Sequence, residues 1–245
     1  MHDVHHHDEV ASTNDTLLAL AQDGAPTGTV VIARRQTAGR GRQGRSWLTL
    51  PGEHLFMSIL WRPPSGFDPA RVTGITLAMG VAACDVLRGL GVDARLKWPN
   101  DLWIGERKVA GILSELHDQH AGLFVVIGLG LDVNADQVPA ELASIATTLE
   151  MALGRRVDLP SLGEALVTAM RSECDAYAAR GGPDVAAYAE RCLTIGRRAR
   201  VEGRVGRAVD IAPDGALLVT WDDSPEAAPD RVVAGDVDVL PPEAA

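Results

Sequence analysis

The stretch Gln36-Thr37-Ala38-Gly39-Arg40-Gly41-Arg42-Gln43-Gly44-Arg45-Ser46-Trp47 holds three glycines and three arginines within seven consecutive residues. The whole chain has a formal net charge of -10, so this concentration of cations indicates a local cause. A guanidinium group suits phosphate and carboxylate, and glycine lets the backbone approach a ligand closely. The stretch predicts a loop that closes over an anionic small molecule; a solvated arginine–glycine turn is the alternative.

The composition is that of an ordinary soluble globular protein. Of 245 residues, 46% are apolar and 23% are charged, which allows one large domain or a large domain with a small one. The acidic balance argues against nucleic-acid or anionic-membrane partners, which need a broad basic face. The longest apolar run, residues 123–131, is too short to span a bilayer.

Cysteine usage and the N-terminus point to the cytoplasm. Cys84, Cys174 and Cys192 are far apart and odd in number, so neither a disulfide framework nor a zinc site is expected. Burial as small apolar residues is favoured over a catalytic thiol. The N-terminus has no apolar signal-peptide region. Its histidines, His2 and residues 5–7, either form a solvated lead-in or bind metal.

Hydrophobic patterning predicts a mixed α+β arrangement up to about residue 193. Short helices are expected at 13–21, 162–178 and 185–191, and a long core helix at 69–90. Ser12 or Thr13 is the expected N-cap of the first helix. Strands are expected at 29–33, 55–61, 95–98, 102–104, 108–116 and 123–133.

The composition changes after residue 193. Short strands are expected at 198–205, 208–212, 216–221 and 231–240, with a turn at Pro213-Asp214-Gly215. Short strands at such close spacing predict a small β-barrel-like domain from about residue 194.

Four segments place polar residues or glycine inside otherwise apolar structure. They are Ser12-Thr13-Asn14, Gln36 to Trp47, Lys97-Trp98-Pro99-Asn100-Asp101, and Lys108-Val109-Ala110-Gly111-Ile112-Leu113 with Gly128-Leu129-Gly130. In this order and spacing they resemble the biotin–protein ligase family over nearly the whole chain. The resemblance implies a mixed-sheet catalytic domain of the biotin/lipoate ligase type at 1–193. A small SH3-like β-barrel domain would follow at 194–245.

The resemblance also implies a two-step reaction. Biotin and MgATP give biotinyl-5'-AMP and pyrophosphate, and the biotinyl group then passes to a lysine of a biotin carboxyl carrier domain. That carrier belongs to a biotin-dependent carboxylase, and the ligase itself would be a monomer or a homodimer. Eleven residues precede Ser12, too few for the helix-turn-helix repressor domain of some members, so a monofunctional ligase without operator binding is expected.

Three cations carry the implied catalysis. The first step brings a carboxylate and a triphosphate together, which requires compensating positive charge. By resemblance, Lys97 contacts the biotin carboxylate and neighbouring phosphate, Arg40 the biotin region and Arg42 the adenylate phosphate. A surface lysine is the alternative for Lys97. Arg45 is expected at a hinge or surface contact. Trp98 is expected to pack on the opposite strand face, with contact to the nucleotide pocket as the alternative.

The implied biotin site is a polar end in an apolar pocket. Ser12, Thr13, Asn14 and Gln36 resemble the residues that hydrogen-bond the ureido ring, with helix capping as the alternative for Ser12 and Thr13. Gly111 and Gly128 would let backbone approach the bicycle, or serve tight strand packing. The full implied biotin set is Ser12, Thr13, Asn14, Gln36, Gly39, Arg40, Gly41, Arg42, Lys97 and Gly111.

The implied nucleotide-binding set differs from the usual family pattern at one residue. It comprises Arg42, Trp47, Lys97, Asn100, Asp132 and Asn134. Trp47 would close over adenine or anchor the core. Asp132 stands where the family usually has Asn, and an ionised carboxylate only accepts hydrogen bonds. It would add negative charge near the nucleotide or bind a cation, with Asn134 as a possible substitute. The metal site stays open: Asp101 and Asp132 are the candidate Mg²⁺ ligands, and for Asp101 the alternatives are orienting a partner or a structural turn.

Two other functions are weighed. A lipoate or octanoate ligase or transferase shares the implied fold, but such enzymes generally lack the arginine–glycine loop. Octanoyl transfer uses a cysteine nucleophile, and no cysteine lies near these motifs. A non-catalytic nucleic-acid-binding protein would need many phosphate contacts, and one short loop on an acidic chain offers few.

Overall fold

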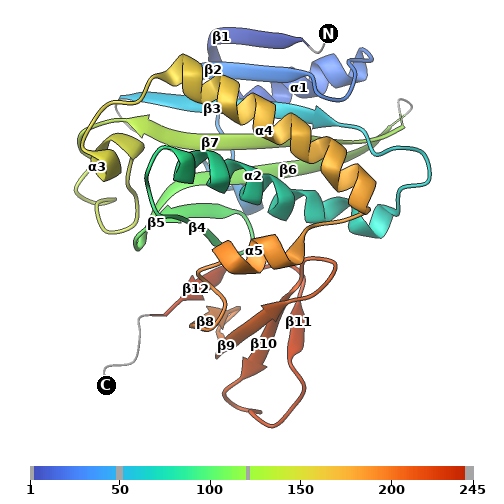
Figure 1. Cartoon of the computed structure of the whole chain (residues 1–245), viewed down its shortest axis with the longest axis vertical. Coiled ribbons are helices and arrows are strands. Elements are labelled where there is room, and N and C mark those ends of the chain that lie inside the picture. The colour runs from blue at the N-terminus through green and yellow to red at the C-terminus, as the bar shows by residue number, and fades with distance from the viewer. Residues whose placement is uncertain (1–2, 48–51, 120–121, 241–245) are drawn as a thin grey trace.

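A computed structural model describes residues 3–47, 52–119 and 122–240. Its main element is a seven-stranded sheet (Figure 1). In spatial order the strands are β1 (Val4–Val10), β2 (Val30–Gln36), β3 (Glu53–Trp61), β7 (Gly122–Asn134), β6 (Arg107–Gln119), β5 (Asp101–Ile104) and β4 (Ala94–Lys97). Among the described strands of this sheet, β1 and β2 pair in parallel and the other neighbours are antiparallel, so the sheet is mixed.

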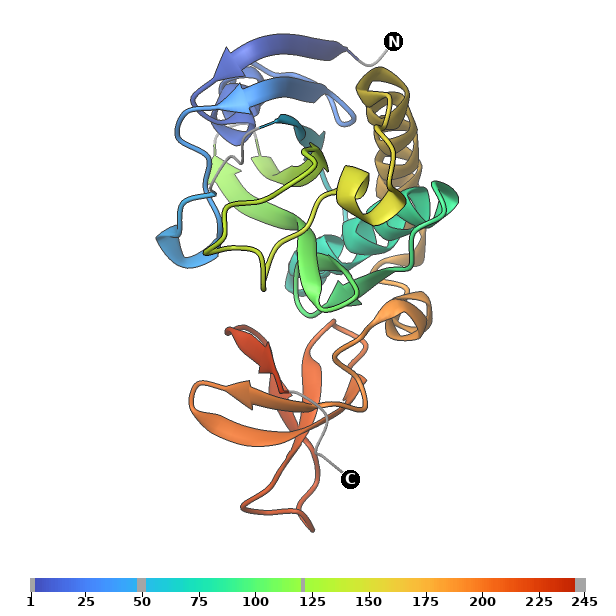
Figure 2. The same ribbon diagram turned by 90° about the vertical axis from the view of Figure 1, so that its left-hand side faces the viewer.

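Helices cover the two faces of this sheet unequally. The long helices α2 (Ile75–Gly89) and α4 (Leu159–Arg180) lie on one face, and α1 (Thr13–Gln22) lies on the other (Figures 1 and 2). Two short helices complete the set, α3 (Leu149–Leu153) and α5 (Val185–Arg191), and α5 leads into the second sheet. Short 3-10 helices occur at η1 (Arg42–Gly44) and η2 (Pro69–Gly74).

Side-chain alternation along β3 and β7 separates the core from the other face. Met57, Ile59, Ile127 and Leu129 belong to the main apolar cluster beneath α2 and α4. The residues between them point the opposite way, because successive side chains of a strand alternate. Under α1 they form a small second cluster that includes Leu60, Phe124 and Val126. Farther along the same face, Ser58 and Gly128 pair in register and leave room for other groups.

A separate five-stranded antiparallel sheet follows. Its order is β11 (Asp230–Val232), β10 (Leu217–Trp221), β9 (Arg204–Ile211), β8 (Arg198–Val201) and β12 (Val237–Val239). The expected α+β class, with a small C-terminal β region, is confirmed. Across the described residues β11 and β12 do not pair, so the sheet is not closed into a barrel. The boundary at 193/194 stays a prediction, since apolar residues of both sheets form one continuous cluster.

Trp98 joins the two sheets. Its side chain is 2% exposed, and its Nε1 donates to the Gly215 carbonyl at 2.9 Å. Its backbone N–H donates to Thr194 Oγ1 at 3.1 Å. Packing is therefore confirmed as a role of Trp98.

The N-terminal histidines are not a lead-in. Residues 4–10 form β1, an edge strand parallel to β2, and its side chains are mostly exposed. The pattern could not reveal this strand, because an edge strand is held by backbone hydrogen bonds and buries little of either face. His2 lies outside the described residues.

The expected helix at 69–90 divides in two. Asp68 accepts from Ala70 N at 3.0 Å and starts the 3-10 turn, and α2 begins only at Ile75. At the break, a Cβ on Gly74 would lie 2.8 Å from the Tyr177 hydroxyl, so this glycine serves close packing. Within Pro69–Gly89, an 18-residue window has a mean hydropathy of 1.5, high enough for a membrane span, yet 61% of that window is buried within the fold.

Other boundaries shift at caps and left-handed turns. The helix expected at 162–178 begins at Leu159, because Asp158 accepts from Ser161 N at 3.0 Å. The strand expected at 198–205 contains a turn at Glu202 and Gly203, whose φ angles are 49° and 86°. The strand expected at 231–240 is two strands separated near Gly235, with φ 133°.

Candidate functional site

One cavity lies on the sheet face that carries α1. It has a volume of about 320 Å³, within the range of small-ligand sites. Its walls come from the start of α1, the arginine–glycine loop, the β4–β5 turn, β6, β7 and the segment leading into β12. The C-terminal sheet therefore contributes to the same cavity as the seven-stranded sheet.

Most sequence-predicted site residues meet in this cavity. Those that line it are Ser12, Thr13, Asn14, Gln36, Arg40, Gly41, Arg42, Trp47, Lys97, Asn100, Asp101 and Gly111. Gly39, Asp132 and Asn134 do not. A Cβ on Gly39 would lie 2.9 Å from Gln36 Nε2 and 3.3 Å from Trp47 Cβ, so this glycine packs behind the loop.

One end of the cavity is lined mainly by neutral polar side chains. Gln36 Oε1 accepts from Thr13 N at 2.7 Å and from Thr13 Oγ1 at 3.1 Å. Ser12 is the N-cap residue of α1, but its side chain makes no capping hydrogen bond. Capping by the Ser12 hydroxyl was therefore the wrong alternative. Ser12, Thr13 and Asn14 are each about 4% exposed or less, so their polar groups are held away from bulk water.

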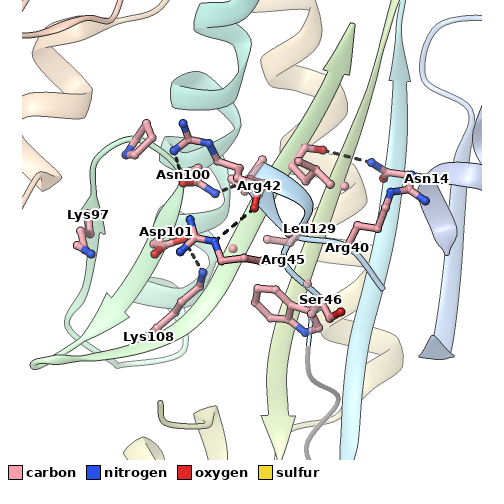
Figure 3. Close-up of a pocket in the computed structure, with 18 of the residues that line it drawn as sticks. Asn14, Arg40, Arg42, Arg45, Ser46, Lys97, Asn100, Asp101, Lys108 and Leu129 are labelled. Carbon is pink, nitrogen blue, oxygen red and sulfur yellow. Dashed lines mark hydrogen bonds and ion pairs between the residues drawn. The ribbon is translucent and has the colours of Figure 1, made fainter. Parts of the chain in front are cut away.

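Asn14 lies over the middle of the sheet (Figure 3). Its Oδ1 accepts from Ser58 Oγ at 2.6 Å, and its Nδ2 donates to Glu115 Oε2 at 2.6 Å and to the Leu113 carbonyl at 3.4 Å. A Cβ on Gly128 would lie 2.3 Å from Asn14 Oδ1. Gly128 is therefore tightly packed, and it also lines the cavity.

The arginine–glycine stretch folds back on itself. Gly41 N donates to the Arg45 carbonyl at 2.6 Å, and Trp47 N donates to the Gly39 carbonyl at 2.9 Å. The turn between them includes Gly44 at φ 73°, a conformation that favours glycine. The three arginines leave this turn in different directions.

Each loop arginine has its own partners. Arg40 Nη1 lies 2.7 Å from Asp15, and its Nη2 lies 3.1 Å from Glu115. The hydrogen bond to Asp15 is the main reason that the Arg40 pKa is raised. Arg42 Nη1 donates to Asn100 Oδ1 at 3.3 Å and to the Gly235 carbonyl at 3.4 Å.

Arg45 ties the loop to the C-terminal sheet region. Its Nη2 lies 2.5 Å from Asp236 Oδ1, and both side chains are at least half exposed. The expected surface contact is therefore present.

Two lysines occupy the charged end of the cavity (Figure 3). Lys97 Nζ lies 4.9 Å from the centroid of the Trp103 ring, and burial lowers the pKa of Lys97, opposed mainly by Asp101. Lys108 Nζ lies 2.6 Å from Asp101 Oδ1 and 5.0 Å from the Trp47 ring centroid. Sequence reasoning gave Lys108 no role, although it opens the Lys108-Val109-Ala110-Gly111-Ile112-Leu113 motif.

Trp47 lies against two strand glycines. A Cβ on Gly111 would be 2.7 Å from Trp47 Cζ3, and one on Gly130 would be 2.9 Å from Trp47 Cε2. These glycines thus make room for an indole ring, and Gly111 still lines the cavity. Trp47 Nε1 is buried and has no hydrogen-bond partner among the described residues.

The charge in the cavity opposes the charge of the chain. Its lining includes Arg40, Arg42, Arg45, Lys97 and Lys108 against the carboxylates Asp101, Asp236 and Asp238. This leaves a formal excess of two positive charges in a chain of net charge -10. Such a site attracts an anion.

Comparison with known proteins decides the family. A family model described as "Biotin/lipoate A/B protein ligase family" matches residues 8–132, slightly more than half of the chain. The chain belongs to this family. The resemblance that the four motifs carry is therefore confirmed.

Relatives and solved structures of this ligase family agree over most of the chain. A Mycobacterium tuberculosis protein named biotin--[acetyl-CoA-carboxylase] ligase is 38% identical, over 86% of this chain and 80% of that protein. The bifunctional ligase/repressor BirA of Bacillus spizizenii is 33% identical, over 86% of this chain and 67% of that protein. A biotin protein ligase structure from Aquifex aeolicus in complex with biotin and ATP has a TM-score of 0.81 and 25% identity. It covers 98% of this chain and 99% of that chain.

The two residues expected beside the nucleotide are engaged elsewhere. Asp132 Oδ1 lies 3.1 Å from His54 Nδ1 on the neighbouring strand, and both side chains are almost fully buried. Asn134 is bonded to the Val157 backbone in both directions, donating to its carbonyl at 2.8 Å and accepting from its N–H at 2.9 Å. Their nucleotide role stays a prediction, on residues that lie outside the cavity lining.

We predict that Gly128→Ala destabilises the protein. The added methyl group would overlap Asn14 Oδ1, so the free energy of unfolding should fall by about 1–3 kcal/mol. Urea denaturation measures it. Gly89→Ala is the matched control, since a Cβ there meets nothing within 4 Å. Equal stability of Gly128→Ala and the unaltered protein would contradict the close packing described here.

We predict that Asp132→Asn stabilises the protein at about pH 7. Burial raises the pKa of Asp132, with the His54 pair opposing. Between the ordinary carboxyl pKa and the raised pKa of folded Asp132, the folded state holds a proton that the unfolded state has released. Stability is therefore lost as the pH rises through that range. Asparagine removes that loss, so the gain should shrink as pH falls toward the ordinary carboxyl range. Urea midpoints across pH measure it, with exposed Asp118→Asn as control; a gain independent of pH would contradict the assignment.

Proposed function

We propose that this chain is a biotin--[biotin carboxyl-carrier protein] ligase, which forms biotinyl-5'-AMP and transfers biotin to a carrier lysine. The observation that carries this proposal is a cavity with two chemically different ends (Figure 3). One end carries neutral polar side chains around Asn14, with Arg40 beside them; the other holds Lys97 and Lys108. Biotin has the same division, a neutral urea at one end and a carboxylate at the other.

The neutral end fits a urea. A urea presents two N–H donors and a carbonyl acceptor, and it needs partners of both kinds in a water-poor pocket. Buried Ser12, Thr13 and Asn14 supply hydroxyls and an amide, and Gln36 supplies a second amide. The biotin set predicted from the sequence is kept here, with Gly39 supporting the loop from behind.

The charged end fits the first reaction step. A carboxylate oxygen of biotin attacks the α-phosphorus of ATP, and the bond to pyrophosphate breaks, leaving its electrons on the departing oxygen. Lys97, Lys108 and Arg42 would neutralise the approaching anions and the charge that develops on the leaving group. An acceptor on the nucleotide or biotin would also satisfy the buried Trp47 Nε1.

The second step gives the chain its partner. The amine of a carrier lysine attacks the acyl carbon of biotinyl-5'-AMP, and AMP leaves. The loop around Arg42 would shield the reactive adenylate from water until the carrier arrives. We place this reaction in the cytoplasm, on a monomer or homodimer, with a carboxylase carrier domain as substrate and no nucleic-acid partner.

Magnesium would enter with the triphosphate. Mg²⁺ is commonly held by substrate phosphates, water and one or two carboxylates. Asp101 faces the cavity and fits as such a carboxylate, whereas Asp132 lies outside its lining. Among the described residues no group of three His, Cys, Asp or Glu is placed to hold a metal alone. The bound ion would supply further neutralisation of phosphate charge.

The lipoate or octanoate alternative is disfavoured by the same site. All three cysteines are buried, and none is among the described residues that line the cavity. Burial raises the pKa of Cys84 to about 11 and that of Cys174 to about 12, which keeps both as thiols. A dithiolane or alkyl chain also offers no donor for the second lone pair of the Asn14 amide oxygen, of which Ser58 uses the first.

Biotin-dependent ATP–pyrophosphate exchange with magnesium tests the function. We expect exchange with biotin and none with lipoate, because only biotin satisfies both ends of the cavity. Exchange with lipoate alone would transfer the assignment to the sister ligases. Folded protein that exchanges with neither substrate would refute ligase activity.

Single-residue variants test the charged end. Lys97→Ala should abolish adenylation, and Arg42→Ala should speed adenylate release about 10- to 100-fold, the loss of one charge-assisted hydrogen bond. Exchange and single-turnover release measure these effects. Arg35→Ala is the control, because Arg35 pairs with Glu9 at the surface, away from the cavity. Normal biotinylation by both cavity variants would contradict the assignment of this cavity as the ligase site.

A further inference from the structure

Glu115 contacts two cavity residues without lining the cavity itself. It lies on β6, on the same face as Gly111 and Leu113. Its Oε2 accepts from Asn14 Nδ2 at 2.6 Å, and its two oxygens lie 3.1 and 3.2 Å from Arg40 Nη2. One partly exposed carboxylate is thus shared by a loop guanidinium and a buried amide.

This contact fixes which way the Asn14 amide points. The oxygen and nitrogen of an amide are similar in size but opposite in hydrogen bonding, so an unconstrained side chain can present either. An ionised carboxylate only accepts, which requires Asn14 Nδ2 to face Glu115. The Leu113 carbonyl, also an acceptor, lies 3.4 Å from the same nitrogen. Oδ1 must then face the other way, toward Ser58 Oγ at 2.6 Å.

The fixed orientation gives the neutral end of the cavity a definite chemistry. An amide oxygen has two lone pairs, and the Ser58 hydroxyl uses one of them. The second is left for an N–H group, which the ureido ring of biotin carries. With the amide reversed, Asn14 would instead present its NH₂ to that N–H, donor against donor.

We infer that Glu115 is a positioning residue for biotin recognition, which holds the Asn14 amide so that its oxygen accepts from a ureido N–H. The inference rests on the proposed function. Glu115 acts through Asn14 and does not touch biotin. Its second contact, with Arg40, is shared with Asp15, which lies 2.7 Å from Arg40 Nη1. Among the described residues the Asp15 carboxylate has no hydrogen bond to the Asn14 amide, so a variant of Asp15 tests the Arg40 contact separately.

The test is steady-state exchange with biotin, reported as separate KM and kcat values. Glu115→Ala should raise the KM for biotin about 10-fold, the loss of one charge-assisted hydrogen bond. The kcat and the KM for ATP should stay within about 2-fold. Glu115→Gln should restore most of the biotin KM, since its amide oxygen still accepts from Asn14. Asp15→Asn should leave the biotin KM unchanged.

A double-mutant cycle isolates the pathway. In an Asn14→Ala background, Glu115→Ala should add no further increase in the biotin KM, because the amide it orients is gone. If Glu115→Ala does not fold, Glu115→Asp replaces it: the charge stays, but the shorter side chain cannot hold the 2.6 Å contact. The same rise in the biotin KM is then expected.

Three results would overturn the inference. They are an unchanged biotin KM in Glu115→Ala, additive effects with Asn14→Ala, or an equal rise in Glu115→Gln and Asp15→Asn. The last would mean that neutralisation of Arg40 by carboxylates, and not orientation of Asn14, sets the biotin KM. Unaltered protein without biotin-dependent exchange would overturn the proposed function as well, so the two failures are distinguishable.

Discussion

The site depends on the two-residue alternation of the central strands. On β3 and β7 every second side chain is a large apolar residue that packs under α2 and α4. The intervening positions include Ser58, Gly128 and Gly130, which leave shallow surface on the opposite face. A one-residue shift in strand register would exchange these faces, so that the core side chains would face solvent and large apolar side chains would fill the cavity. The stability of the fold and the existence of the cavity therefore come from the same register.

Side chains of the protein itself fill the space above the glycines of this face. Asn14 lies where a Cβ of Gly128 would be, and Trp47 lies over Gly111 and Gly130. Small residues on the strands thus allow side chains from α1 and from the loop to descend to the sheet. That close approach buries Asn14 and the Trp47 indole nitrogen, and buried polar groups are costly unless they are paired. The Trp47 indole N–H has no partner among the described residues, and a bound ligand can accept a hydrogen bond from it.

The C-terminal sheet is part of the site as well as a neighbour of it. Trp98 bonds to Gly215 and Thr194, which fixes the strand end that carries Lys97. Arg42 donates to the Gly235 carbonyl and Arg45 pairs with Asp236, so two of the three loop arginines contact the segment leading into β12. A change in the packing of the two sheets would therefore move the cations of the cavity directly.

The sequence alone determined the α+β class, most of the strands and helices, and the four motifs whose residues meet in the cavity. Those features are local: alternation, helical spacing, caps and glycine-rich turns are written in neighbouring residues. The edge strand at 4–10 was missed because backbone pairing leaves no periodic pattern. Residues 198–205 were predicted as one strand because the turn inside them begins at Glu202, which is left-handed although it is not glycine. Only the tertiary structure decided that Lys108 joins the cavity, that Asp132 pairs with His54 outside it, and that Glu115 orients Asn14. Each of these joins residues on different elements, and the distance between two side chains far apart in the chain is set by strand register and packing, which no local pattern encodes.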